Sequence, residues 1–345
     1  MAKNGDFSAE ADAAFFASYD GLPVHEKMIK DEIRTESYLN AMEDNPHLFK
    51  DKIVLDIGTG TGILSMFAVR AGAKHVYAID VSNMIDNARK MAEVNNMSHK
   101  ITFIKARVEE AKLPMVDIIV SEWMGFCLLS EIMLDCLLYA RDKFLVPGGL
   151  VFPDKTSLHI AGIEDGERMS GKVDYWNNVY GLDFSPVKPA AISKGFLRTP
   201  DSSAVITKAT CVLDLDLQTV QISDSTLKSL PFQLAANRDD TVHAFLAWFD
   251  YEFTAGLEPV WVSTGPFSPP THWKQTVFYL EKPVKMRKGD AITGEVSFEQ
   301  YQRDLNVRFS YKYESSSANG VNETNGFNGM NAVSGFGLYK VDAVE

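Results

Sequence analysis

The first half of the chain alternates short apolar runs with amphipathic segments. Residues 53–57 form an apolar run of strand length, and residues 63–71 show helical spacing before Gly72. The alternation continues with strand, helix, strand and strand over residues 75–79, 82–95, 101–105 and 116–120. A helix over residues 131–144 follows, and we expect Pro147-Gly148-Gly149 to end it. Such alternation predicts an α/β domain, in which helices cover both faces of a parallel sheet.

The pattern changes after Pro153, where strand-like runs are separated by turns. These runs occupy residues 156–160, 210–215, 241–253, 276–280 and 307–313. They predict an all-β second domain. Residues 315–335 are rich in Ser, Asn and Gly, which is typical of a loop, and here the loop would join two terminal strands.

The change in pattern suggests a division of the chain into three parts. We expect a helical segment over residues 1–45, a cofactor-binding domain over 46–152 and a β domain over 153–345. Residues 163–195 interrupt the strand pattern with aromatic and apolar residues such as Tyr180. An apolar excursion of this kind needs a partner to cover it.

Composition narrows the class of partner. A formal net charge of −12 over 345 residues disfavours a nucleic-acid backbone and favours a cationic partner, although an acidic surface equally suits a soluble protein. The three cysteines show neither a disulfide framework nor metal-ligand spacing, so no metal is expected. Without an apolar signal core or membrane span, we expect a cytoplasmic protein, with the nucleus as a second option.

The ends of the first two strands carry the candidate cofactor chemistry. Asp56 lies in the first strand, Gly58-Thr59-Gly60-Thr61-Gly62 follows it, and Asp80 ends the second strand. Glycines let a ligand approach the backbone, and a terminal carboxylate can accept hydrogen bonds from both ribose hydroxyls. Together they favour an adenosine cofactor over tight packing alone. The glycine spacing differs from the dinucleotide fingerprint, yet these residues alone leave NAD open.

Four ordered motifs resemble those of the protein arginine methyltransferase family. Residues 54–64 are similar to the first motif of class I methyltransferases, and residues 15–19 and 25–35 resemble the N-terminal helix of the family. Residues 121–125 and 271–273 resemble two further motifs. The resemblance implies a Rossmann-like parallel-sheet domain followed by a β-barrel-like domain with a helical dimerisation arm. It also implies S-adenosyl-L-methionine as the methyl donor and arginine in proteins as the acceptor.

The resemblance assigns roles around the cofactor. It implies that Arg34 pairs with the cofactor carboxylate, that Asp80 holds the ribose and that Glu109 accepts a hydrogen bond from the adenine amino group. Met28 and Met133 would flank the reactive end; outside this motif context, a methionine is usually a core filler. The implied cofactor-binding residues are Phe16, His25, Met28, Arg34, Asp56, Gly58, Gly60, Asp80, Val108, Glu109 and Met133.

Glu122 and Glu131 are the candidate catalytic acids. A guanidinium group stays protonated up to about pH 12, so a site must hold it, direct its charge and accept a proton. The two glutamates are nine positions apart, which does not suit one helix face but suits a loop at the carboxyl end of the fourth strand. The family implies that this double-glutamate loop binds the substrate. The implied substrate-binding residues are Tyr19, Glu122, Met124, Glu131 and Trp273.

His272 is the third candidate catalytic residue. The resemblance makes it a proton relay, paired with an acid such as Asp31. From histidine chemistry alone, a hydrogen-bonded tether between the two domains is equally plausible. The chain also departs from the family: Phe15 replaces a usual tyrosine, Asp80 replaces a glutamate found in many members, and Leu129 and Ser130 stand where aromatic residues are common.

Product type and assembly follow from the resemblance. The pair Met28 and Met133 implies a type I enzyme, which makes monomethyl and asymmetric dimethyl arginine. Residues 163–195 resemble the dimerisation arm, so we expect a homodimer or a hetero-oligomer with a related subunit. Expected substrates are arginine- and glycine-rich proteins, including RNA-binding proteins and histone tails, with no membrane and no direct nucleic-acid role. The alternatives are an NAD-dependent oxidoreductase and a scaffold subunit active only in complex with a related chain. A small-molecule or nucleic-acid methyltransferase is a third alternative, which the predicted all-β domain and the motifs disfavour.

Overall fold

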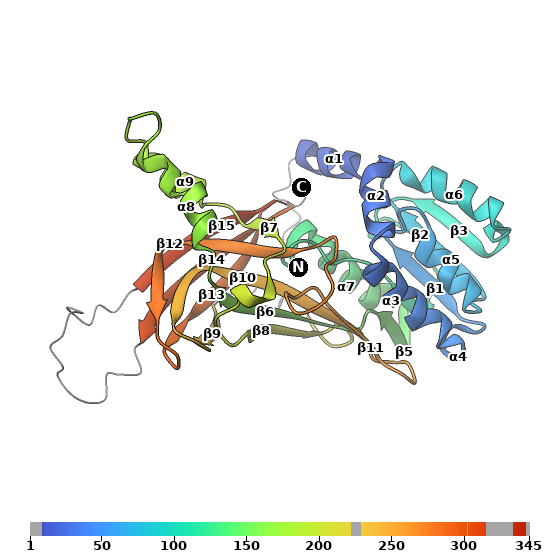
Figure 1. The fold of residues 1–345 in the computed structure, drawn as a ribbon. Helices are drawn as coiled ribbons and strands as arrows, with labels where there is room; N and C mark the ends of the chain where they lie inside the picture. Colours follow the sequence, from blue (N-terminus) through green and yellow to red (C-terminus); the bar gives the residue numbers. More distant parts are fainter. Residues whose placement is uncertain (1–8, 222–228, 302, 315–333, 343–345) are drawn as a thin grey trace.

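The computed structural model places a parallel-sheet unit beside a longer antiparallel unit, with N-terminal helices packed against the former (Figure 1). It describes residues 9–221, 229–301, 303–314 and 334–342. Both units contribute to one continuous apolar core, which runs from helix α3 through both sheet types to the last strand.

Four helices precede the first strand: α1 (Ala9–Ser18), α2 (Leu22–Ile29), α3 (Glu32–Glu43) and α4 (Pro46–Phe49). Asp31 begins α3 as its N-cap, because its side chain accepts a hydrogen bond from the Arg34 N–H at 3.1 Å. Tyr38 and Met42 of α3 are fully buried. Helix α3 is thus fixed at its start by a cap and along its length by packing, which places Arg34 reproducibly.

The parallel sheet has the strand order β3-β2-β1-β4-β5. Its strands are β1 (Ile53–Ile57), β2 (His75–Asp80), β3 (Ile101–Lys105), β4 (Val116–Val120) and β5 (Leu145–Phe152). All of their pairings are parallel. The predicted α/β domain is confirmed, and the carboxyl ends of β1, β2 and β4 meet along one edge of the sheet.

The helices of this unit are α5 (Ile63–Arg70), α6 (Met84–Val94) and α7 (Met133–Phe144), with short 3-10 turns η1 (Ser98–Lys100) and η2 (Ser130–Ile132). Two expectations need correction here. Helix α7 begins at Met133 rather than Glu131, because Glu131 (φ 77°) and Ile132 (φ 64°) have left-handed backbones. The Pro147-Gly149 run does not merely end the helix but lies inside β5, an edge strand where a missing N–H is tolerated.

The antiparallel unit contains two sheets. One has the order β7-β12-β10-β6-β8, with β11 also pairing β10, and the other has the order β15-β14-β13-β9. The strands are β6 (Lys155–Ile163), β7 (Phe196–Arg198), β8 (Thr210–Asp216), β9 (Leu230–Ala235), β10 (Asp240–Phe253), β11 (Val260–Ser263), β12 (Gln275–Met286), β13 (Ala291–Tyr301), β14 (Asp304–Glu314) and β15 (Ser334–Val341). All five predicted runs fall on strands.

Isolated bridges join the edges of the two antiparallel sheets. Lys194 pairs with Lys340 at one edge, and Thr207 pairs with Ala236 at the other. Side chains such as Phe245 and Phe309, whose ring centroids are 5.0 Å apart, fill the space between the sheets. The unit is therefore an all-β, barrel-like structure joined by bridges rather than by continuous ladders.

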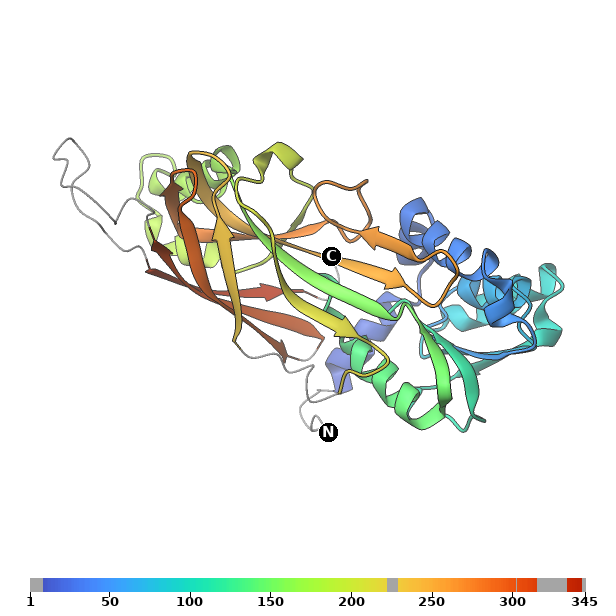
Figure 2. The same ribbon diagram turned by 90° about the horizontal axis from the view of Figure 1, so that it is seen from below.

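A helical excursion leaves the antiparallel unit between β6 and β7. It comprises α8 (Gly166–Lys172), η3 (Asp174–Asn177), η4 (Ser185–Val187) and α9 (Lys188–Ala191). In both ribbon views it lies at the end of the molecule away from the parallel sheet (Figure 2). A further turn, η5 (Ser202–Ala204), follows β7. The loop predicted over residues 315–335 lies outside the described residues, except that Ser334 and Gly335 already belong to β15.

Candidate active site

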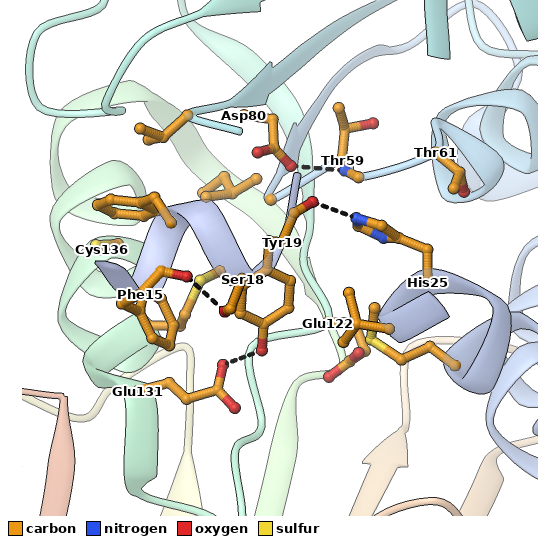
Figure 3. A pocket seen from close by; sticks show the side chains of 18 of the residues that line it. Phe15, Ser18, Tyr19, His25, Thr59, Thr61, Asp80, Glu122, Glu131 and Cys136 are labelled. Carbon is orange, nitrogen blue, oxygen red and sulfur yellow. Dashed lines mark hydrogen bonds between the residues drawn. The ribbon is translucent and has the colours of Figure 1, made fainter. Parts of the chain in front are cut away.

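A cavity of about 670 Å³ lies where the N-terminal helices, the carboxyl ends of the parallel strands and the segment around Trp273 meet. Figure 3 shows side chains from the N-terminal helices, from the ends of β1 and β2 and from the loop between β4 and α7 around it. The cavity wall brings together nearly all residues singled out in the sequence: Phe16, Tyr19, His25, Met28, Arg34, Gly58, Gly60, Asp80, Val108, Glu109, Glu122, Met124, Glu131, Met133, His272 and Trp273. Only Asp56 of the predicted set is outside it.

The glycine-rich turn needs its glycines for conformation and space. Gly60 has φ +50°, and a Cβ there would lie 3.0 Å from Cε1 of His25. The Gly60 N–H donates a hydrogen bond to Asp80 Oδ2 at 2.7 Å, and the Ser82 N–H donates to Asp80 Oδ1 at 2.7 Å. Each carboxylate oxygen retains a further lone pair, so Asp80 can still accept hydrogen bonds from a ligand.

Asp56 stabilises the glycine-rich turn through hydrogen bonds inside the protein. Its Oδ2 accepts hydrogen bonds from Thr59 Oγ1 at 2.7 Å and from Ser65 Oγ at 2.6 Å. The side chain is buried, and burial raises the pKa of Asp56 to about 6. The structure therefore gives Asp56 internal partners rather than a place on the cavity wall.

The two candidate acids come from the loop between β4 and α7 and face one cavity (Figure 3). Glu131 accepts a hydrogen bond from the Tyr19 hydroxyl at 2.9 Å. Burial raises the pKa of Glu131 to about 8; the nearby Glu122 adds to the rise, while Tyr19 and Arg303 oppose it. The expected pair of convergent acids is present, and one of them holds a proton unusually well.

Arg34 joins helix α3 to the first candidate acid, Glu122. Its Nη2 and Nε donate to Glu122 Oε2 at 3.0 Å and 3.3 Å, and both side chains are less than a tenth exposed. Within the described residues, Arg34 Nη1 is buried and has no hydrogen-bond partner. A buried cation with a spare donor at the wall is suited to bind an anionic group.

His272 and Asp31 form the pair that the sequence suggested. Asp31 Oδ2 accepts hydrogen bonds from the backbone N–H and from Nδ1 of His272, both at 2.7 Å. Burial tends to raise the pKa of Asp31, but the hydrogen bonds from His272 outweigh it and bring the pKa below its usual value. Trp273 Nε1 donates to the Met124 carbonyl oxygen at 2.8 Å. These contacts tie the 271–273 segment to α3 and to the glutamate loop.

Two arginines on the cavity wall were missed in the sequence. Arg303, in the turn between β13 and β14, lines the cavity and contacts Glu131 and Asp12. Arg107 also binds Asp12 and lines the cavity. In a sequence, a single arginine beside a turn is normally interpreted as a solvent-exposed charge. No local spacing connects these two positions to the glutamate loop.

Comparison with curated proteins decides the family. The chain is 49% identical over 322 residues to Protein arginine N-methyltransferase 1 of Schizosaccharomyces pombe, which covers 92% of this chain and 94% of that protein. It is 47% identical over 319 residues to the protein of the same name from Saccharomyces cerevisiae, covering 90% and 91% of the two chains. The chain belongs to the protein arginine N-methyltransferase family. Residues 154–316 match the family model described as the arginine methyltransferase oligomerization subdomain.

Solved structures of the family share the whole architecture. The Trypanosoma brucei arginine methyltransferase 1 enzyme–prozyme heterotetrameric complex with AdoHcy contains a chain that superposes with a TM-score of 0.87 at 38% identity, covering 94% of this chain and all of that one. Arabidopsis thaliana protein arginine methyltransferase 10, described as a uniquely open conformation, gives 0.82 at 26% identity, covering 94% and 99%. Residues 34–143 also match the model of the ribosomal protein L11 methyltransferase.

Membership confirms the predicted enzyme class, a type I protein arginine N-methyltransferase that uses S-adenosyl-L-methionine. It does not favour the scaffold alternative, and it gives no support to an NAD-dependent oxidoreductase. Oligomerisation is supported by the subdomain match and by the heterotetrameric neighbour. In the part of the chain that the structure describes, no helix is long and apolar enough to cross a membrane.

Proposed function

We propose that this chain methylates arginine in glycine- and arginine-rich proteins, giving monomethyl and asymmetric dimethyl arginine. The observation that carries the proposal is the convergence of Glu122 and Glu131 on one cavity that also contains Arg34 and the glycine turn. Two carboxylates can bind one guanidinium group from two sides, which fixes its orientation for in-line attack.

The cavity wall fits S-adenosyl-L-methionine on the evidence of its polar groups. Among the residues that the structure describes, Arg34 has a buried donor without a partner, which suits the cofactor carboxylate. Asp80 has lone pairs left for the ribose hydroxyls. Val108 and Glu109 would border the adenine, and Met28 and Met133 would flank the reactive end. When bound, the cofactor supplies an electrophilic methyl group on a sulfonium, and its transfer leaves a neutral thioether.

The chain then supplies orientation and a proton acceptor. Glu122 and Glu131 hold the substrate guanidinium and draw its positive charge away from the attacking nitrogen. Burial raises the pKa of Glu131 to about 8, but an approaching guanidinium cation favours the carboxylate form. Glu131 can thus accept the proton that the nitrogen loses as it gains a methyl group. His272 would relay that proton, beside its role as a tether to Asp31.

The methionine pair supports the type I product. Met28 and Met133 both line the cavity, and both side chains are unbranched and flexible. A monomethylated guanidinium could therefore bind again, with its methylated nitrogen facing the methyl group of a second cofactor molecule. Asymmetric dimethyl arginine is the expected end product.

Oligomerisation would use the excursion over residues 163–195, here called the arm. Tyr180 is 98% exposed and Leu182 is 62% exposed, as expected for side chains that another chain covers. We propose that the arm binds the cofactor-binding unit of a second copy, with a related subunit as the alternative. Native mass spectrometry of the purified chain and of material from the source cell tests this, and a single chain type supports the homodimer.

We further propose that the protein is located in the cytoplasm, with the nucleus as a second location. Cell fractionation tests this.

A labelled-methyl assay tests the function. Transfer from S-adenosyl-L-methionine to a Gly-Arg-rich peptide is expected, with none to the same peptide in which lysine replaces every arginine. Equal labelling of both peptides, or of neither, would contradict the proposal. Mass spectrometry of the product then distinguishes asymmetric from symmetric dimethyl arginine.

A further inference from the structure

We propose that Arg303 is a positioning residue for methyl transfer, which clamps the backbone of Glu131 and fastens helix α1 beside it. The inference rests on the proposed function in one respect only, because Glu131 is taken as the acid that binds the substrate. Arg303 lies in the β13–β14 turn, far from Glu131 in sequence, so the clamp joins the antiparallel unit to the glutamate loop.

Both backbone polar groups of Glu131 are held by Arg303. The Glu131 N–H donates to the Arg303 carbonyl oxygen at 2.8 Å. In return, Arg303 Nη1 donates to the Glu131 carbonyl oxygen at 2.8 Å. The second bond is charge-assisted and is formed by the side chain, so substitution can remove it while the first remains available.

The clamped backbone is in a conformation that needs support. Glu131 has φ 77° and the next residue, Ile132, has φ 64°. Residues with a Cβ rarely occupy this region, and each such residue stores strain that the surroundings must offset. The left-handed pair lies directly before the first residue of α7, so its relaxation would change the direction in which the Glu131 side chain leaves the loop.

The same guanidinium group fastens α1. Arg303 Nε donates to Asp12 Oδ1 at 3.0 Å, and the Arg303 and Asp12 side chains are 11% and 15% exposed. Arg303 Cζ also lies 4.8 Å from the ring centroid of Phe15 and 4.9 Å from that of Phe16. Tyr19 follows this helix and donates to the Glu131 carboxylate. The Arg303 side chain therefore holds the Glu131 backbone directly, and it also fastens the helix next to Tyr19, which binds the Glu131 carboxylate.

Arg107 provides a matched control. It also binds Asp12 and lies 5.1 Å from the Phe16 ring, so it shares the attachment of α1. The bond to the Glu131 carbonyl oxygen comes from Arg303. Loss of Arg107 tests the attachment of α1, whereas loss of Arg303 tests that attachment together with the clamp.

Amide hydrogen exchange over residues 130–132 tests the clamp and requires no activity assay. Arg303→Gln should speed exchange about tenfold, since opening of the strained turn becomes easier, and Arg107→Gln should leave it near the native rate. Equal exchange in the native chain and Arg303→Gln would overturn the clamp. Arg303→Lys keeps the charge but lacks the planar guanidinium group, which can donate to several acceptors at once. Exchange at the native rate in that variant would also overturn the clamp.

Kinetics test the positioning role. Arg303→Gln should lower kcat about 30-fold on a Gly-Arg-rich peptide, with the KM for S-adenosyl-L-methionine near the native value and a smaller loss of kcat in Arg107→Gln. Equal losses in the two variants would assign the effect to α1 alone. If Arg303→Gln fails to fold, Arg303→Lys carries both measurements. A native chain that methylates no peptide contradicts the proposed function, while the exchange result still decides the clamp.

Discussion

Tyr19 donates its hydroxyl hydrogen to Glu131 Oε2 at 2.9 Å, across 112 positions of the chain. The bond joins the end of the N-terminal helix α1 to the loop that carries both candidate acids. Burial raises the pKa of the Tyr19 hydroxyl itself well above its usual value, and the charge on Glu131 adds to that rise, so the tyrosine acts as a donor throughout the physiological range. The residue that directly follows helix α1 therefore contributes to the cavity that contains both candidate acids.

Tyr19→Phe should weaken catalysis and shift its pH dependence. The bond from Tyr19 lowers the pKa of Glu131, so its loss should raise that pKa further above about 8. The rising limb of the kcat profile, which needs the carboxylate, should move to higher pH, and kcat at pH 7 should fall about tenfold. Ser18→Ala is the control, because Ser18 donates to the Phe15 carbonyl oxygen instead. Superimposable profiles for native and Tyr19→Phe would refute this role.

Gly60→Ala should impair cofactor binding more than folding. The new Cβ would lie 3.0 Å from the His25 ring, in a residue with φ +50°, so the turn or the ring must move. We expect the affinity for S-adenosylhomocysteine to fall about tenfold or more, measured by calorimetry. Gly148→Ala is the matched control, since Gly148 has φ +77° but open space around it. Equal losses in the two variants would mean that backbone strain, not the cofactor turn, is responsible.

The elements that local periodicity defines were predicted best. Strands β1 to β4 are apolar runs that end at recognisable turn residues, including the glycine turn after β1. The pair His272 and Asp31 was found through motif context. Strand β5 was missed because its Pro147 and Gly148 break local patterns, although an edge position tolerates them. Arg303 was missed for a different reason. Its role depends on a contact between distant segments, which no spacing within the sequence encodes.

Asp31→Asn should destabilise the protein in a pH-dependent way. Because the folded pKa of Asp31 lies below the unfolded value of about 3.9, its stabilising contribution is fully present above that pH and is lost as pH falls through the folded pKa. Near pH 7 we expect a loss of about 1–3 kcal/mol in the free energy of unfolding, since two hydrogen bonds from His272 lose their charged acceptor. Urea titrations at pH 7 and pH 3 measure it. A loss that does not shrink at the lower pH would contradict this account.

Met28→Phe should alter the distribution of products. A larger, stiffer ring at the reactive end should hinder a second methylation on an already methylated nitrogen, so the ratio of asymmetric dimethyl to monomethyl arginine should fall about fivefold. Met28→Leu, which nearly conserves volume, serves as the control. Mass spectrometry of a peptide with one arginine gives the ratio. An unchanged ratio in Met28→Phe would remove Met28 from product control.

The most direct test of the central claim compares methyl transfer by the native chain with that by Glu131→Gln. The amide keeps the size of the side chain but loses the charge that binds guanidinium and accepts its proton. We expect kcat on a Gly-Arg-rich peptide to fall at least about a hundredfold. Binding of S-adenosylhomocysteine should stay near native, and Glu110→Gln, at an exposed position outside the cavity, should be fully active. A Glu131→Gln variant as fast as the native chain would contradict the account.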